Sequence, residues 1–102
     1  MSVVVVATIV PIPEHRAAVI EAITEAIDQV HGEDGCELYS LNEAPDRLIM
    51  IEKWASREAL AAHSAGPNLA ALGPKLAGKV TGAPEVIVLH QVLAGDPVKG
   101  AL

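Results

Sequence analysis

Two apolar segments, one near each end of the 102-residue chain, constrain the fold more than any other feature. The first, Val3 to Val10, is an almost continuous run of β-branched residues, and two prolines close behind it end it. The second, Glu85 to Leu93, reads EVIVLHQVL and is apolar at both odd and even positions. Strands of this kind need cover on both faces, so we expect neither face of these strands to be left to water.

Two regions between these strands have helical periodicity. From Glu14 to His31, apolar residues recur at spacings of three and four, which predicts a helix with one buried stripe, and Pro13 suits its first position. A second helical region follows Ser56, which suits an N-cap; it is broken at Pro67 and continues irregularly because of Pro74. The stripe of the first helix comprises Val19, Ile20, Ile23, Ile27 and Val30.

The middle of the chain predicts a hairpin. Cys36 to Leu41 and Leu48 to Trp54 favour strands, and the polar segment NEAPDR between them favours a turn. The element order is then β-α-β-β-α-β, the ferredoxin-like α+β arrangement with helices on one face of an antiparallel sheet. The other face stays open unless a second copy covers it. We therefore expect a homodimer formed through the sheet faces, a dimeric α+β barrel.

Length and composition limit the remaining choices. One domain spanning residues 1–102 is expected, with a core at about 3–93 and a tail, 94–102, that is loose or partner-bound. Seven basic and 13 acidic residues give a net charge of −6, which argues against nucleic acid as a partner. No apolar run approaches about 18 residues, so no membrane partner is expected. The single cysteine, Cys36, suits a reducing, cytoplasmic location and a packed position on a strand rather than a reactive one.

Strand alternation places Met50, Glu52 and Trp54 on one face of the second hairpin strand. A carboxylate among apolar neighbours is costly unless it is paired. For Glu52 this favours a salt bridge to an Arg or Lys, or a position near the strand end that reaches water, over a role in a site.

Two further side chains could carry chemistry. His63 follows Leu60 by three residues on the same helical face, which turns its ring towards the sheet. From spacing alone, a hydrogen-bonded core histidine is the favoured interpretation and catalysis the other, and Trp54 likewise favours the core. The phenol of Tyr39, if buried, needs a partner and could instead orient a ligand.

Several common sites are not predicted. The other histidines, His15, His31 and His90, form no metal-binding spacing, and one cysteine cannot supply a zinc site, so no metal is expected. The chain has no G-x-G-x-x-G, no P-loop and no G-x-S-x-G, so these motifs predict neither a nucleotide cofactor nor a serine nucleophile.

The stretch GCELYSL, followed by IEKW, EALAAH and GPNL, resembles the antibiotic biosynthesis monooxygenase family, which includes small quinol monooxygenases. The resemblance covers about residues 3–93. Its most specific part is Glu52 and Trp54 followed by E-x-L-x-x-H, which ends at His63. It implies a dimer of ferredoxin-like subunits, each with a cavity between sheet and helices. It also implies oxidation of polycyclic phenols or hydroquinones by O₂ without metal, haem or flavin.

The resemblance also assigns roles. We expect a cofactor-independent monooxygenase acting on a small phenolic or hydroquinone-type substrate, with His63 as general base and Glu52 as support. Many quinol-type relatives have Pro-His after the helix, where this chain has Pro67-Asn68. Related haem-degrading enzymes need an axial His on the later helix, and this chain has no His between residues 69 and 79. The expected substrate-binding residues are Trp54, Tyr39, Met50 and Asn68.

Two alternatives stay open at this point. One is a ligand-binding or stress-related dimer that keeps the cavity but has no turnover. The other is an isomerase or decarboxylase on the same scaffold, in which His63 transfers a proton without oxygen chemistry.

Overall fold

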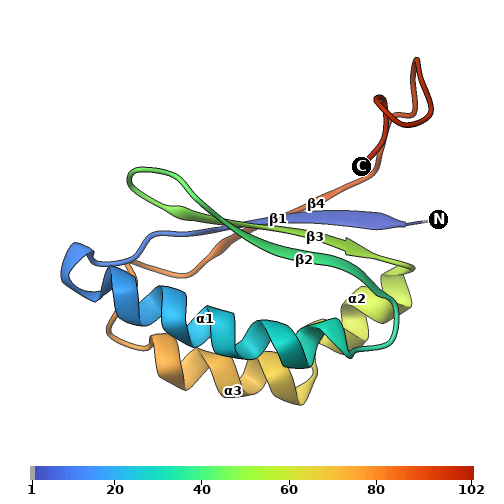
Figure 1. The fold of residues 1–102 in the computed structure, drawn as a ribbon. Coiled ribbons are helices and arrows are strands. Elements are labelled where there is room, and N and C mark those ends of the chain that lie inside the picture. Colours follow the sequence, from blue (N-terminus) through green and yellow to red (C-terminus); the bar gives the residue numbers. More distant parts are fainter. Residues whose placement is uncertain (1) are drawn as a thin grey trace.

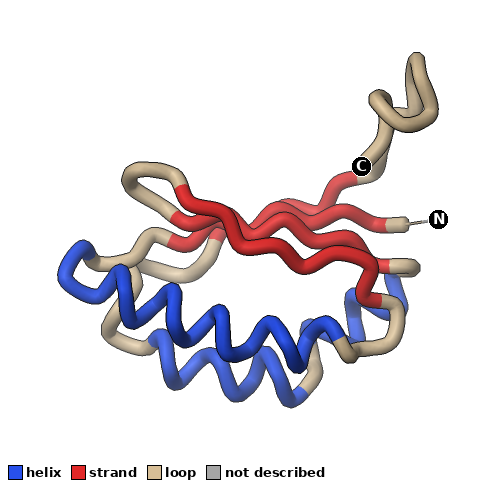
Figure 2. The backbone as a smooth tube through the Cα atoms, in the orientation of Figure 1, coloured by secondary structure: helices blue, strands red, loops and turns tan. Residues whose placement is uncertain are grey.

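A four-stranded antiparallel sheet carries all of its helices on one face (Figures 1 and 2). The computed structural model describes residues 2–102. The helices pack beneath the sheet, as the ferredoxin-like prediction requires. The second helical region is two separate helices, so the order is β-α-β-β-α-α-β. The strands are β1 (Val3–Ile9), β2 (Cys36–Glu43), β3 (Leu48–Trp54) and β4 (Glu85–Leu89), in the sheet order β2-β3-β1-β4. The helices are α1 (Arg16–His31), α2 (Arg57–Ser64) and α3 (Pro67–Leu76), and a 3₁₀ turn at Pro13–His15 precedes α1.

The alternation predicted for β3 is confirmed. Leu48, Met50, Glu52 and Trp54 are buried on the helix side, whereas the residues between them are half-buried on the other side. The stripe of α1 packs against this face, with Val19 and Ile23 almost fully buried. The core is therefore a single layer between the sheet and the helices.

The ends of two strands differ from the prediction. β2 continues through Asn42 to Glu43, because the pairs Asn42–Ile49 and Glu43–Leu48 extend the hairpin ladder and the Asn42 amide donates to the Ile49 carbonyl. β4 ends at Leu89 rather than Leu93. Its only neighbour is β1, and Leu89 already pairs with Val4, next to the first residue of β1.

Two local signals fix the helices that approach the site. The Ser56 hydroxyl accepts a hydrogen bond from the Ala59 amide at 3.1 Å, which confirms the predicted cap of α2. Gly66 precedes α3, and Pro67 takes its first position, where a missing N–H has no cost. The break between the helices turns α3 back alongside α1 (Figure 1).

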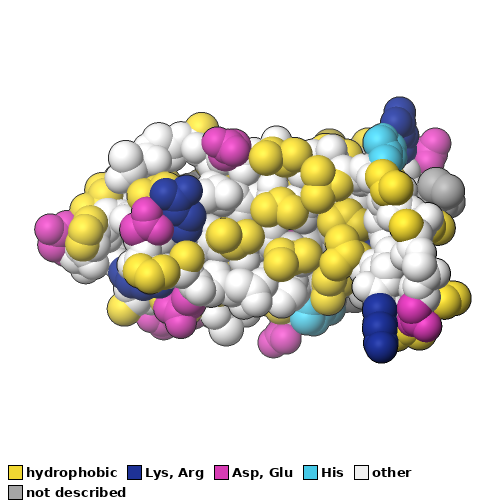
Figure 3. Space-filling view, turned by 90° about the horizontal axis from the view of Figure 1, so that it is seen from above, with side chains coloured by type: hydrophobic (Ala, Val, Ile, Leu, Met, Phe, Trp, Pro, Cys, Tyr) yellow, Lys and Arg dark blue, Asp and Glu magenta, His cyan; other side chains and the backbone are white. Residues whose placement is uncertain are grey.

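The face of the sheet opposite the helices is mainly apolar and largely uncovered within the chain (Figure 3), although Val4, near one end of it, is buried. Ile87 and Leu89 of β4 are exposed on it, and Val6 and Ile51 are half-buried. β4 is exposed on the helix side as well, where Val86 has an exposed fraction of 59%. The predicted need for cover on both faces is therefore not met for β4 within one chain.

The segment after β4 forms hydrogen bonds within itself. Asp96 accepts hydrogen bonds from the amides of Val98 and Lys99, and the Leu102 amide donates to the Gln91 side chain. Lys53 of β3 donates to the Leu102 carbonyl at 2.8 Å. The segment stands away from the sheet at one end (Figure 1). Within residues 2–102, no helix is long and apolar enough to cross a membrane.

Replacing Gly35 with Ala should lower the free energy of unfolding by about 2–5 kcal/mol, because left-handed backbone costs other residues about 1–2 kcal/mol and overpacking adds about 1–3. Gly35 has φ 81°, and a Cβ there would lie 2.5 Å from the Cβ of Ala59 in α2. Gly78→Ala is the matched control, since Gly78 has φ 75° but faces open space. Urea unfolding compares the two, and equal losses would contradict the role of the contact with Ala59.

Candidate functional site

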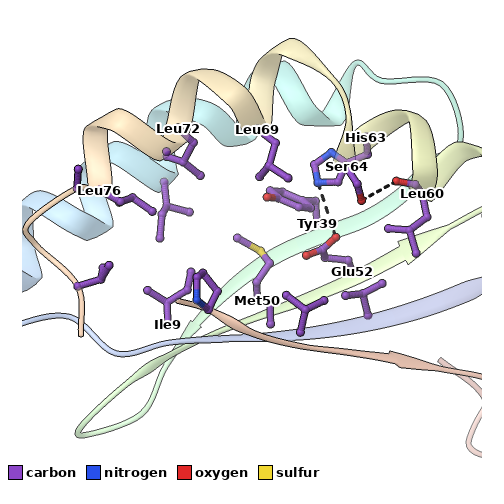
Figure 4. Close-up of a pocket in the computed structure, with 18 residues that line it drawn as sticks. Ile9, Tyr39, Met50, Glu52, Leu60, His63, Ser64, Leu69, Leu72 and Leu76 are labelled. Carbon is purple, nitrogen blue, oxygen red and sulfur yellow. Dashed lines mark hydrogen bonds and ion pairs between the residues drawn. The ribbon is translucent and has the colours of Figure 1, made fainter. Parts of the chain in front are cut away.

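A cavity of about 390 Å³ lies between the helix side of the sheet and the helices α2 and α3 (Figure 4). This volume is within the range of about 300–1,000 Å³ typical of small-molecule sites. Aliphatic side chains supply most of the wall. The lining residues are Val5, Ala7, Ile9, Ile23, Tyr39, Met50, Glu52, Leu60, His63, Ser64, Leu69, Leu72, Gly73, Leu76, Ala77, Val80, Pro84 and Val86.

His63 is the central polar residue of the wall, and Glu33 fixes its orientation. The Nδ1 atom of His63 lies 3.0 Å from Oε1 of Glu33, and the Asn68 amide donates to Oε2 of the same carboxylate at 2.9 Å. An ionised carboxylate only accepts hydrogen bonds, so Nδ1 carries the proton. In the neutral ring, Nε2 is then left as the acceptor. His63 is 4% exposed, so little water competes with Glu33 for the hydrogen bond that fixes this tautomer.

The Nε2 side of His63 faces Glu52. Oε1 of Glu52 lies 4.0 Å from Nε2, which is too long for a hydrogen bond, and it accepts one from the Trp54 indole at 2.9 Å. The expected pairing of Glu52 with an Arg or Lys is therefore wrong: its partners are Trp54 and His63. Burial raises the pKa of the Glu52 carboxyl, and the hydrogen bond from Trp54 opposes this only in part.

Two aromatic rings hold the imidazole in place. Trp54 stacks on His63 with ring centroids 4.4 Å apart, and Tyr39 meets it edge-on at 5.4 Å. Such contacts restrict ring rotation, so His63 is held by packing as well as by Glu33. Its position at the cavity is therefore well defined before any ligand binds.

The hydroxyl of Tyr39 is available to a ligand. Burial raises the pKa of this phenol, and the nearby Glu52 raises it further, so the hydroxyl stays protonated and can donate. The hydrogen bond that His31 forms with Tyr39 goes to the backbone carbonyl, and none within residues 2–102 involves the hydroxyl. Tyr39, Glu52 and His63 thus offer one donor and two acceptors to the same part of the cavity.

The predicted site residues fall into two groups. Tyr39, Met50, Glu52 and His63 line the cavity, so the structure brings these four together. Trp54 is fully buried behind His63 and does not line it. Asn68 also lies outside the wall and holds Glu33 instead. A role of Trp54 and Asn68 in substrate binding stays a prediction. From these positions Trp54 would act by packing on His63, and Asn68 by holding Glu33.

Sequence reasoning missed Glu33. It belongs to the turn HGEDG, where an acidic residue is normally solvated, and its partner His63 is 30 residues away. The available signal was Gly35, which lets this turn approach α2 closely. Near it, burial raises the pKa of the Cys36 thiol, in keeping with an unreactive strand residue. Within residues 2–102, no group of three or more side chains is arranged to hold a metal ion.

The sequence of this chain also matches a known protein family. The model of the family described as "Antibiotic biosynthesis monooxygenase" matches residues 2–73, which include all four residues with polar side chains in the cavity wall. The chain belongs to the antibiotic biosynthesis monooxygenase family. This confirms the resemblance found in the sequence.

Two named relatives support the same assignment. "Putative monooxygenase Rv0793" of Mycobacterium tuberculosis is 35% identical over 68 residues, covering 65% of this chain and 67% of that protein. "Probable quinol monooxygenase YgiN" of Escherichia coli K12 is 31% identical over 81 residues, covering 69% of this chain and 78% of that protein.

The fold of this family member matches solved structures along most of its length. The structure of Rv0793 superimposes with a TM-score of 0.85 at 28% identity, covering 94% of this chain and all of that one. A structure from Caulobacter crescentus CB15, described as "a putative antibiotic biosynthesis monooxygenase", gives a TM-score of 0.83 at 26% identity, covering 89% of this chain and 90% of that one. This chain therefore shares its ferredoxin-like fold with both structures.

Glu52→Gln should change how stability depends on pH. Because the folded-state pKa of Glu52 is raised, the wild-type protein loses unfolding free energy as pH rises from about 4.5 through that pKa. Gln keeps an acceptor for Trp54 but carries no charge, so the stability of the variant relative to wild type should grow over this interval. Urea unfolding at several pH values measures it, with the exposed Glu21→Gln as control. A difference that stays constant with pH would contradict the assignment.

Proposed function

We propose that this protein is a cofactor-independent monooxygenase that oxidises a phenolic or hydroquinone-type substrate with O₂. One observation carries the proposal. His63 presents an acceptor nitrogen to a largely aliphatic cavity, while Glu33 holds its other nitrogen in the protonated form. Such a pair is suited to remove a proton from a bound hydroxyl group.

The first step is deprotonation. A substrate hydroxyl lies at Nε2 of His63, which takes its proton and becomes an imidazolium. Glu33 stabilises that charge through Nδ1, and Glu52 lies 4.0 Å from the newly protonated nitrogen. Both carboxylates therefore favour the product of the transfer over the neutral starting pair.

The second step is electron transfer from the phenolate to O₂, which gives an aryloxyl radical and superoxide. For a hydroquinone with a free ring position, the two radicals combine at that carbon to a hydroperoxide, which loses water and gives a hydroxyquinone that keeps one oxygen atom of O₂. For an anthrone-like phenol, the radicals combine at carbon to a hydroperoxide, which loses water and leaves a carbonyl group. The apolar wall keeps water away from the radical pair.

The other residues bind and orient the substrate. Met50 and the aliphatic side chains of α3 contact the flat ring, and the Tyr39 hydroxyl donates to a substrate oxygen. Trp54 and Asn68 fix the base by contacting His63 and Glu33. The name of the Escherichia coli relative, a probable quinol monooxygenase, supports the same substrate class for this chain.

Oxygen uptake with a panel of hydroquinones and anthrone-like phenols tests the proposal. An oxygenase consumes O₂ with at least one of them, and we expect that result. An isomerase or decarboxylase would convert its substrate without O₂, and a protein that only binds ligands would do neither. Either of these outcomes would overturn the proposed reaction.

His63→Ala should lower the rate of O₂ consumption by about 10²-fold or more, the range expected for loss of a general base. His63→Gln keeps more of the packing against Trp54 and should be similarly slow. The matched control is His15→Ala, since His15 is exposed and is not part of the cavity wall. Circular dichroism establishes that each variant is folded, and an unchanged rate in both His63 variants would remove the residue from the mechanism.

We further propose that the open face of the sheet packs against a second copy of the chain. The face is mainly aliphatic, and its charged residues Lys53 and Glu85 lie at opposite ends of the strands. A two-fold axis perpendicular to the strands would therefore place the end that carries Lys53 in one copy over the end that carries Glu85 in the other. This distribution of apolar and charged residues is complementary to the same face of a second copy.

Ile51→Lys, at the middle of this face, should convert the protein from dimer to monomer in sedimentation experiments. A buried ammonium at a paired apolar surface has no partner, whereas a half-buried position on a free surface tolerates it. Ala17→Lys adds the same charge at an exposed position of α1 and should leave the dimer intact. A wild-type protein that sediments as a monomer would refute the sheet-to-sheet contact.

A further inference from the structure

Polarity is distributed unevenly along the cavity. Eighteen residues line it, and four of them have polar side chains: Tyr39, Glu52, His63 and Ser64. Ser64 already donates its hydroxyl hydrogen to the Leu60 carbonyl at 3.0 Å. Three polar groups are therefore left to meet a ligand.

These three groups lie at one end. His63 and Tyr39 are in ring contact, and Glu52 pairs with Tyr39 across the β2–β3 ladder. Figure 4 shows them beside α2, whereas Ile9 and Leu76 mark the opposite end. A ligand that fills the cavity thus meets hydrogen-bonding groups at one end only.

The charges near this site have one sign. No Lys or Arg is among the lining residues, while Glu52 is in the wall and Glu33 lies directly behind His63. A carboxylate on the ligand would lose its hydration without gaining a cation. The carboxyl of Glu52 shows this cost of desolvation, because burial in the cavity wall raises its pKa.

The cavity also has a defined mouth. The exposed residues of its wall towards the apolar end are Gly73 and Ala77 of the α3 region and Pro84 and Val86 at β4. A substituent longer than the cavity would emerge between α3 and β4. Added length should therefore gain contact area at first and then stop doing so.

We propose that the cavity selects neutral phenols with a single polar head and an apolar body, and rejects those that carry a carboxylate at the far end. The hydroxyl lies at Tyr39, Glu52 and His63, and the body extends along α3 to Leu76. The choice of His63 as the reacting end rests on the proposed function. The selection itself follows from the wall and narrows the proposed substrates: it favours simple and anthrone-like phenols over hydroquinones, whose second hydroxyl would meet the apolar end.

Binding of simple 4-alkylphenols, measured by calorimetry without O₂, tests the selection independently of turnover. Affinity should rise by about fourfold for each methylene buried, and then level off when the chain reaches the mouth. The matched probe is 3-(4-hydroxyphenyl)propanoate, which has a similar body and a terminal carboxylate. It should bind at least tenfold more weakly than 4-butylphenol.

Leu76→Lys should reverse this preference, because it places a cation at the apolar end of the cavity. The variant should gain affinity for the carboxylated phenol and lose affinity for 4-butylphenol. Ala71→Lys is the control, since Ala71 is exposed on the same helix and outside the cavity wall, and it should leave both affinities unchanged.

Tyr39→Phe tests the position of the head. It should weaken all of the alkylphenols by a common factor of about three to ten and leave the gain per methylene unchanged. A change in the gain per methylene would show that Tyr39 contacts the body instead, and would overturn the orientation.

The outcomes separate this proposal from the reaction. Selective binding without O₂ uptake would support the substrate shape and contradict the monooxygenase. O₂ uptake together with equal binding of neutral and carboxylated phenols would support the monooxygenase and contradict the proposed selection. Affinity that is independent of chain length, or a preference that Leu76→Lys does not alter, would overturn the proposed selection.

Discussion

The candidate site depends on one contact, the hydrogen bond between Glu33 and His63. It joins the turn after α1 to helix α2 and connects segments 30 residues apart. Without it, neither ring nitrogen would have a fixed role, since either can carry the proton. Asn68, at the start of α3, holds the other carboxylate oxygen, so all three helical regions contribute to the state of a single imidazole.

Much of the fold could be predicted because it follows from local periodicity. Strand β3 begins and ends at the predicted residues, Leu48 and Trp54, and alternation alone assigned its faces. The cap at Ser56 and the break at Pro67 were visible as residue types with one strong positional preference. The end of β4 was not predictable in this way, because it is set by the length of its partner β1.

The site was predicted in part, and the division has a physical cause. Faces of strands and helices placed Tyr39, Met50 and His63 at a common cavity. Hydrogen bonds between distant segments have no periodic signal. The partner of Glu52 was therefore assigned wrongly, and Glu33 was missed, since an acidic residue in a polar turn is usually solvated. Asn68 stands where many quinol-type relatives have His, and its contact with Glu33 depends on how α3 packs.

The exposure of β4 has a consequence for the rate at which ligands enter and leave. This strand has five residues, pairs only with β1, and is exposed on both faces, while Val86 at its start also borders the cavity. Edge segments with few buried contacts open at lower free energy than the rest of a fold. Exchange of a ligand past Val86 would therefore depend on fraying of β4 within one chain, and a partner that covers this strand would slow it.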